Sequence, residues 1–167
     1  ADPAHANGVV ALEWLNVSAA ELCPDWAFLH ESITGTGTTW VGVSAQSVGI
    51  AGGGAAFDVS LKRVDPERYR SLSHPGDSFS YDIYSQAAQA VRNPEGIDPL
   101  DGLTVQRMIG IGESQSAGRM ATYVNAIHPT VELFDGFLIH SRGGSSAPLS
   151  QDPQVAIPTS GRASIRT

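Results

Sequence analysis

The most informative part of the chain is the segment Val105-Gln-Arg-Met-Ile-Gly-Ile-Gly-Glu-Ser114-Gln-Ser-Ala-Gly-Arg-Met-Ala-Thr-Tyr-Val-Asn125. Its first part, residues 105–111, is short and apolar, which is typical of a strand buried in a sheet. Residues 115–127 have the pattern of a helix, and we expect this helix to end at His128 because the residue before a proline avoids helical dihedral angles. The segment therefore predicts a strand, a sharp turn and a helix, in that order.

The turn itself is Gly112-Glu-Ser-Gln-Ser116, which is the G-x-S-x-G pattern of a nucleophile elbow with serine in place of the last glycine. In an elbow, the serine stands clear of the sheet edge in a strained conformation, and small residues on either side let the strand and the helix approach each other. The N-terminus of the following helix favours the negative charge that develops on an acyl oxyanion. Ser114 is therefore the candidate nucleophile.

Two other interpretations of the turn are open at the level of sequence. Taking Ser116 as the nucleophile keeps a second glycine, Gly118, in the pattern, but Ser116 would then lie inside the helix. A plain strand-to-helix turn with a serine N-cap would also give this sequence, because five-residue serine motifs often arise by chance. We prefer Ser114, which follows the strand after one residue, where the sharp turn is expected.

A dinucleotide site is a further interpretation, based on Gly110-Ile-Gly112 between the strand and the helix. The third glycine of that motif is replaced by Gln115, and Glu132, at the spacing of a ribose ligand, precedes the next strand instead of ending it. A phosphate-binding P-loop is excluded, because the only lysine is Lys62. The five histidines show no paired spacing and Cys23 stands alone, so we predict neither a metal site nor a cofactor.

Composition limits the partners and the compartment. With 167 residues, 41% of them hydrophobic and 16% charged, the chain is expected to form one domain. The net charge of −7 disfavours nucleic acid and anionic membrane as partners, and no apolar run approaches the ~18 residues of a membrane span. Signal-peptide features are absent and the single cysteine excludes an internal disulfide, so a cytoplasmic protein and one secreted after signal removal are both compatible.

The rest of the chain predicts alternating strands and helices. Strands are expected at residues 9–17, 38–44, 105–111 and 131–140, and helices at 26–33, 79–91 and 115–127. The strand at 38–44 is apolar enough to be buried on both faces. The helix at 26–33, which Asp25 or a neighbour can cap, has the apolar set Trp26, Phe28, Leu29 and Ile33. An insertion-like loop at 45–78 and a Ser-, Gly- and Pro-rich tail at 141–167 complete an α/β fold, with a mostly parallel sheet and helices on both faces.

Active sites of such sheets lie at the C-terminal ends of the strands. Besides Ser114, the segments at such ends are 16–19, 44–46 and 140–142. His140 belongs to this group, but Asp135, five residues before it on the same predicted strand, would point to the opposite face. These two residues therefore make no pair by local geometry. His74 lies in the long loop and is interpreted as a turn residue.

Six segments together resemble one known family. They are Glu13-Trp-Leu-Asn-Val-Ser18, Trp40-Val-Gly-Val-Ser-Ala-Gln46, Leu72-Ser-His-Pro-Gly-Asp77, Tyr81-Asp-Ile-Tyr-Ser-Gln86, Gly112-Glu-Ser-Gln-Ser-Ala117 and Asp135-Gly-Phe-Leu-Ile-His-Ser-Arg-Gly143. In this order, over about residues 9 to 150, they look like the large bacterial family of alpha/beta hydrolase domain-containing proteins. The resemblance implies an incomplete α/β-hydrolase fold, with residues 1–167 as a partial, internal portion that holds about strands three to six.

The resemblance also implies an activity. It predicts a soluble serine hydrolase that acts on carboxylic esters or related small acyl substrates through an acyl-enzyme on Ser114, without a cofactor. In this fold the triad follows the chain order Ser, acid, His, so the resemblance places the acid and the histidine beyond Thr167, in the remaining part of the same hydrolase. The alternative is a non-catalytic fragment or an inactive relative that lacks these two residues.

The remaining site residues follow from position. The first oxyanion-hole donor is expected to be the backbone N–H of Gln115, the residue after the nucleophile. The second is expected from the loop after the first strand, at Val17 or Ser18 in the stretch that runs to Ala19. Four further residues are expected to line the site: Glu113, Ser116, Arg119 and His140. For Arg119, a solvent-facing position on the helix is equally compatible.

Overall fold

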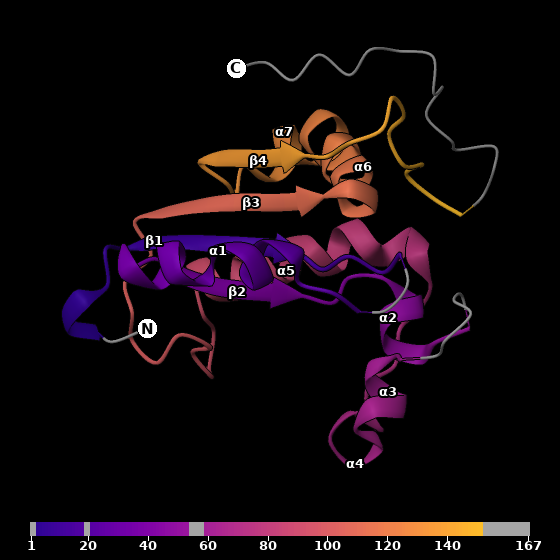
Figure 1. The fold of residues 1–167 in the computed structure, drawn as a ribbon, viewed down its shortest axis with the longest axis horizontal. Helices are drawn as coiled ribbons and strands as arrows, with labels where there is room; N and C mark the ends of the chain where they lie inside the picture. The colour runs from indigo at the N-terminus through magenta and orange to yellow at the C-terminus, as the bar shows by residue number, and fades with distance from the viewer. Residues whose placement is uncertain (1–2, 19–20, 54–58, 152–167) are drawn as a thin grey trace.

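Within residues 3–18, 21–53 and 59–151, which the computed structural model describes, four strands form one parallel sheet. They are β1 (Val9–Trp14), β2 (Thr39–Val43), β3 (Arg107–Glu113) and β4 (Gly136–His140), in the spatial order β2-β1-β3-β4. Their arrows all point the same way in Figure 1. The parallel α/β sheet predicted from the alternating pattern is therefore confirmed.

The register brings the C-terminal ends of the strands to one edge of the sheet. Trp14 of β1 pairs with Val43 of β2, and Glu113 of β3 pairs with His140 of β4. The segments that follow these strands meet at this edge, which is where ligands bind in open α/β sheets. The site is therefore expected here.

Helices cover both faces of the sheet. They are α1 (Pro24–Gly35), α5 (Ser80–Arg92) and α6 (Ser114–Thr122). Helices α5 and α6 share a core with Leu12 and Trp14 of β1. The alternate residue Glu13 is fully buried on the other face, where it accepts hydrogen bonds from the first turn of α1. In Figure 1, α1 lies in front of β1 and β2, and α5 lies behind them.

The core beneath α5 and α6 is rich in aromatic side chains. Tyr84 on α5 is fully buried, and its ring centroid lies 4.8 Å from that of Trp14 and 5.4 Å from that of Phe134. The ring of Tyr123 meets it edge-on at 5.3 Å. The hydroxyl of Tyr84 donates a hydrogen bond to the backbone oxygen of Leu12 over 2.7 Å. This side chain therefore joins helix α5 to the centre of the sheet.

The burial of Tyr84 predicts sensitivity to alkali. Burial raises the pKa of Tyr84 well above its ordinary value of 10.0, and the neighbouring Tyr123 raises it further. Above pH 10 the unfolded chain loses this proton while the folded chain keeps it. The free energy of unfolding should therefore fall by up to about 1.4 kcal/mol per pH unit for this group. Urea unfolding at neutral and alkaline pH checks this; Tyr84→Phe should show a smaller fall, and an equal fall would contradict the account.

The free backbone N–H groups at the N-terminus of α1 donate to a residue of the sheet and not to a side chain that caps the helix locally. Its N-cap residue, Cys23, makes no side-chain hydrogen bond to the helix. Glu13 instead accepts from the backbone N–H groups of Asp25 and Trp26, at 3.1 Å each, and from Nε1 of Trp40 at 2.8 Å. Of the prediction that Asp25 or a neighbour caps this helix, the Asp25 alternative is wrong, and the neighbour Cys23 takes the N-cap position without a side-chain hydrogen bond. Burial has the largest effect on the pKa of Glu13 and raises it. The three hydrogen bonds lower this pKa, but they do not cancel the effect of burial.

Two elements are more exposed than predicted. On α1, Phe28 is 86% exposed and Leu29 is 40% exposed, so these two members of the predicted apolar set are not core residues. Among the described residues, strand β2 pairs with β1 alone, and Val43 is the one residue of this strand that is buried. The prediction that this strand is buried on both faces is therefore wrong, because apolar content does not distinguish an edge strand from a central one.

The predicted long loop at 45–78 contains short helices. They are α2 (Ser47–Ala51), α3 (Leu61–Val64), α4 (Pro66–Tyr69) and the 3-10 helix η2 (Asp77–Phe79); a further 3-10 helix, η1 (Pro3–His5), precedes β1. Residues 54–58 lie outside the described part. In Figure 1, α3 and α4 extend away from the sheet. Helices of four or five residues are too short to show a period in the sequence.

The helix after Ser114 is longer than predicted. It continues from α6 through the π-helix η3 (Tyr123–Ile127) into α7 (His128–Val131). The predicted end at His128 is wrong because Pro129 lies in the first turn of α7, where its missing N–H needs no acceptor. Helix α7 ends at Val131, and the C-cap residue Glu132 has a φ of 47°. Strand β4 consequently begins at Gly136, later than predicted.

Part of the predicted tail packs along α5 and α6. The backbone N–H of Ala147 donates to the oxygen of Gly118 over 3.0 Å, and the hydroxyl of Tyr81 donates to the oxygen of Pro148 over 2.8 Å. Residues 152–167 lie outside the described part. Of the helices in the described ranges, none is long and apolar enough to cross a membrane.

Candidate active site

Ser114 lies at the junction of β3 and α6, at the C-terminal edge of the sheet. Its backbone φ is 53°, in the left-handed region that residues other than glycine rarely adopt. The residue is exposed. A strained serine at a strand-to-helix turn has the conformation expected of a nucleophile elbow. The predicted sharp turn is present, and the serine that it presents is Ser114.

Small residues are needed on both sides of Ser114. A Cβ added to Gly112 would lie 2.4 Å from Cγ of Met120 and 3.0 Å from the backbone oxygen of Ser116. Ser116 is fully buried in α6, where its hydroxyl donates to the oxygen of Glu113 over 2.8 Å and accepts from the N–H of Glu113 over 3.1 Å. The interpretation with Ser116 as the nucleophile is therefore not supported, because its hydroxyl is buried and already bonded.

Replacing Gly112 by alanine is expected to destabilise the protein. The added methyl group overpacks the contact between β3 and α6, which should lower the free energy of unfolding by about 1–3 kcal/mol. Gly118 on α6 provides a matched control, because its added Cβ would meet only backbone atoms at 3.8 Å. Gly118→Ala should therefore be neutral or stabilising. Urea unfolding measures both, and equal stability of the two variants would contradict this packing.

The predicted oxyanion-hole donors differ in their present partners. Gln115 lies in the first turn of α6, where backbone N–H groups have no partner inside the helix. The N–H of Ser18 already donates to Oδ1 of Asn16 over 2.9 Å. This bond must break before the N–H of Ser18 can donate to an oxyanion. Val17 is therefore the stronger of the two candidates for the second donor. Ala19 lies outside the described residues.

Asn16 connects the ends of β1 and β3 beside the candidate nucleophile. It is 3% exposed, and its Nδ2 donates to both the backbone oxygen and Oε2 of Glu113, at 3.0 Å each. Glu113 directly precedes Ser114 and pairs with His140 across the sheet, so these predicted site residues share one edge. The role of Asn16 was not predictable, because 97 residues separate it from Glu113 and no local pattern marks the contact.

Arg119 is bound to the loop that precedes α5 and does not face solvent. Its side chain is 12% exposed, its Nη2 lies 3.1 Å from Oδ2 of Asp77, and its guanidinium lies over the ring of Tyr81. The other carboxylate oxygen of Asp77 accepts from the N–H of Ser47 over 2.8 Å. Arg119 therefore joins α6 to η2 and, through Asp77, to α2, and the solvent-facing alternative is wrong.

The histidines of the site region have other partners. Nδ1 of His74 accepts a hydrogen bond from the N–H of Gly76 over 3.0 Å, and Nε2 of His74 lies 3.0 Å from the backbone oxygen of Ala45. The contact with Gly76, two residues further on, confirms the role of His74 in a turn. His140 contacts Asp25 and not Ser114. In the described ranges, no histidine makes a hydrogen bond with Ser114. The described part of the chain thus shows no base bound to the elbow serine.

Asp135 and His140 form no pair, as predicted, but they do not lie on opposite faces of one strand, because Asp135 precedes β4. Asp135 lies at the opposite edge of the sheet, where it accepts from the N–H of Met108 over 2.8 Å and pairs with Arg92 and Arg107. Burial alone would raise the pKa of this carboxyl, but these hydrogen bonds and charges together lower it. Asp135 therefore holds the start of β3 and takes no part in the site.

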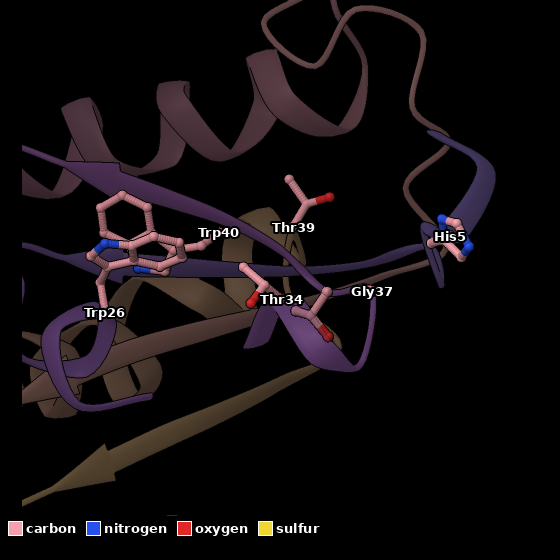
Figure 2. Close-up of a pocket in the computed structure, with 7 residues that line it drawn as sticks. His5, Trp26, Thr34, Gly37, Thr39 and Trp40 are labelled. Atoms are coloured by element: carbon pink, nitrogen blue, oxygen red, sulfur yellow. The ribbon is translucent and has the colours of Figure 1, made fainter. Parts of the chain in front are cut away.

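A cavity of 420 Å³ opens at this opposite edge (Figure 2). It is lined by His5, Trp26, Thr34, Gly37, Thr38, Thr39 and Trp40. Figure 2 shows Trp26 and Trp40 side by side, with ring centroids 4.9 Å apart. Thr39 begins β2, whereas Ser114 follows the end of β3, and the strands are parallel. The cavity therefore does not adjoin the elbow.

The metal-ligating and thiol side chains of the described residues do not form a competing site. In the part of the chain that is described, no group of three or more His, Cys, Asp or Glu side chains is arranged to hold a metal ion. Burial raises the pKa of the Cys23 thiol, and the charge of Glu13 raises it further. A thiol held in its protonated form is a weak nucleophile, so Cys23 does not compete with Ser114 for the role.

Comparison with known families decides the classification. The chain matches the family described as the alpha/beta hydrolase domain over residues 1–167. It belongs to this family. No curated protein and no solved structure gave a significant match. The resemblance drawn from the six sequence segments is therefore confirmed, and the four-stranded parallel sheet with its helices agrees with an alpha/beta hydrolase fold.

Proposed function

We propose that this alpha/beta hydrolase domain is a serine hydrolase that acts on carboxylic esters or related acyl substrates, with Ser114 as the nucleophile. One observation carries the proposal. Ser114 is an exposed residue held at a φ of 53° between β3 and α6. A strained, exposed serine at the carboxyl edge of a parallel sheet is the arrangement that acyl transfer on this fold uses.

In the proposed reaction, Oγ of Ser114 attacks the substrate carbonyl carbon and gives its proton to a histidine that a carboxylate orients. The backbone N–H of Gln115 and a second donor at Val17 stabilise the oxyanion. The bond to the leaving alcohol breaks, the histidine returns its proton to that alcohol, and water then releases the acyl group as a carboxylic acid. The histidine and the acid come, in this proposal, from the remaining part of the same hydrolase beyond Thr167.

A second candidate function is non-catalytic, with the chain as a fragment or inactive relative of a hydrolase. The observation in its favour concerns the base. In the described ranges no histidine is bonded to Ser114, since His74 is engaged in a turn and His140 is engaged with Asp25. Without a base, the hydroxyl of a serine is a weak nucleophile.

Labelling with a fluorophosphonate distinguishes the two candidates. The mass of the purified protein, measured before and after labelling, shows both the length of the polypeptide present and the presence of an adduct. Trypsin cleavage at Arg107 and Arg119 isolates Ser114 in the peptide 108–119. An adduct on Ser114 in a longer protein supports the hydrolase. A mass equal to this chain with no adduct on that peptide supports the non-catalytic candidate.

A further inference from the structure

Three side chains outside the elbow form a continuous hydrogen-bonded chain. Oδ1 of Asp25 lies 2.8 Å from Nε2 of His140, and Nδ1 of the same ring lies 3.2 Å from Oγ of Ser141. Asp25 is on α1 and His140 ends β4, 115 residues away, so the fold alone brings them together. A carboxylate, an imidazole and a hydroxyl in this order are the parts of an activated serine nucleophile.

These contacts assign the proton of the imidazole. The carboxylate of Asp25 can only accept a hydrogen bond, so the neutral ring of His140 carries its proton on Nε2. Its Nδ1 is then left with a lone pair toward the hydroxyl of Ser141. The side chain of Asp25 is 1% exposed, and its second oxygen has no partner among the described residues. The buried carboxylate is therefore available to stabilise a protonated His140.

Ser141 is open to a substrate and is strained. It is exposed, and its φ of 52° lies in the same left-handed region as that of Ser114. Added Cβ atoms on Gly143 and Gly144, which follow it closely, would meet nothing within 4 Å. Strain at an exposed polar residue is typical of functional sites, and the two glycines that follow Ser141 face open space.

We propose that Ser141, His140 and Asp25 form a second acyl-transfer site, which takes small activated esters. Oγ of Ser141 attacks the carbonyl carbon while its proton passes to Nδ1 of His140, and Asp25 balances the charge of the imidazolium. The bond to the leaving alcohol breaks, and this alcohol takes the proton back from Nδ1. Water, deprotonated by His140, then hydrolyses the acyl group and restores Ser141.

This site goes beyond the function proposed for Ser114, because it uses another hydroxyl and a base within the described residues. The two serines follow neighbouring strands, since Glu113 pairs with His140, so the test must separate them. Trypsin does this, because cleavage at Arg119 and Arg142 places Ser141 in the peptide 120–142 and leaves Ser114 in the preceding peptide.

The test labels the full chain carrying Ser114→Ala with a fluorophosphonate and maps the adduct. The expected adduct lies on Ser141 in the peptide 120–142, and a further Ser141→Ala change should remove it. Ser145→Ala, at an exposed serine of the same segment, should leave the labelling rate unchanged. Loss of the base in His140→Gln should lower the rate by about 10²- to 10⁴-fold, and Asp25→Asn should cause a loss of the same order.

Three results would overturn the proposal. The first is a folded Ser114→Ala protein with no adduct on the peptide 120–142. The second is an adduct on that peptide whose rate does not change in His140→Gln. The third is labelling of Ser114, in the parent protein, that depends on His140, because the base would then serve the elbow. Ser141 is exposed, so Ser141→Ala stays informative even where substitution of the buried Asp25 impairs folding.

Discussion

Replacing Ser114 by alanine is expected to abolish ester hydrolysis and leave the fold intact. In the proposed mechanism, Oγ of this residue forms the bond to the acyl group, so no acyl-enzyme can form without it. The loss of turnover should be on the order of 10⁶-fold, down to the background rate. Alanine keeps the Cβ atom, so the backbone strain at a φ of 53° is the same in both proteins. The second proposed site also takes small activated esters, so both proteins carry Ser141→Ala in this comparison. Initial rates with p-nitrophenyl acetate, using the protein with any polypeptide that accompanies it, then measure the effect of Ser114 alone.

The controls separate chemistry from folding. Ser114 is exposed, so its variant should unfold within about 0.5 kcal/mol of the parent in urea. Ser145→Ala, another exposed serine near this edge, should keep full turnover. A folded Ser114→Ala protein that hydrolyses the ester at the parent rate would remove the elbow from the mechanism.

Replacing Tyr84 by alanine is expected to have the largest effect on stability. The ring is fully buried and contacts Trp14, Tyr123 and Phe134, and its hydroxyl binds the backbone oxygen of Leu12. Deleting a buried aromatic ring of this kind costs about 3–5 kcal/mol, because the surrounding side chains fill the cavity only in part. Urea unfolding monitored by circular dichroism should show this loss as a large shift of the midpoint.

Two further variants separate the contribution of the buried ring from that of the hydroxyl group and from that of aromatic removal in general. Tyr84→Phe keeps the ring and removes only the hydrogen bond to Leu12, so its cost should be about 0.5–1.5 kcal/mol. Phe28→Ala removes an aromatic ring that is 86% exposed, and its effect should stay within about 0.5 kcal/mol. A Tyr84→Ala protein as stable as the Phe28→Ala protein would contradict the assignment of the core.

The elements that depend on local pattern were predictable from the sequence. The segment around Ser114 specifies its turn through a run of apolar residues, a small residue at 112 and a helix-forming sequence after it. The structure has β3, the strained serine and α6 in these places. A helix over residues 79–91 was predicted, with six residues available for its buried side: Tyr81, Ile83, Tyr84, Ala87, Ala88 and Val91. Helix α5 is present, and four of the six are buried, whereas Ile83 and Ala87 are half-buried.

The features that depend on distant residues were not predictable. The sequence favours a cap by Asp25, but the cap of α1 comes from Glu13 on β1, while Asp25 turns to His140 at the end of β4. Phe28 was predicted to be buried with the other apolar residues of its helix, but it is 86% exposed. Its burial depends on which side of α1 meets the sheet, and the sequence of the helix does not show that. The helix continues past His128 because Pro129 lies in the first turn of α7, a position that proline tolerates. The dihedral preference of the residue before a proline does not by itself predict this continuation.

A crystal structure of the protein labelled with a phosphonate would show which hydroxyl forms the acyl-enzyme. We expect a covalent bond from phosphorus to Oγ of Ser114. We also expect the phosphonyl oxygen to accept a hydrogen bond from the N–H of Gln115 at about 2.7–3.1 Å. An Oγ of Ser114 that carries no phosphorus, or a phosphonyl oxygen directed away from the N-terminus of α6, would contradict the assignment of Ser114 as the elbow nucleophile.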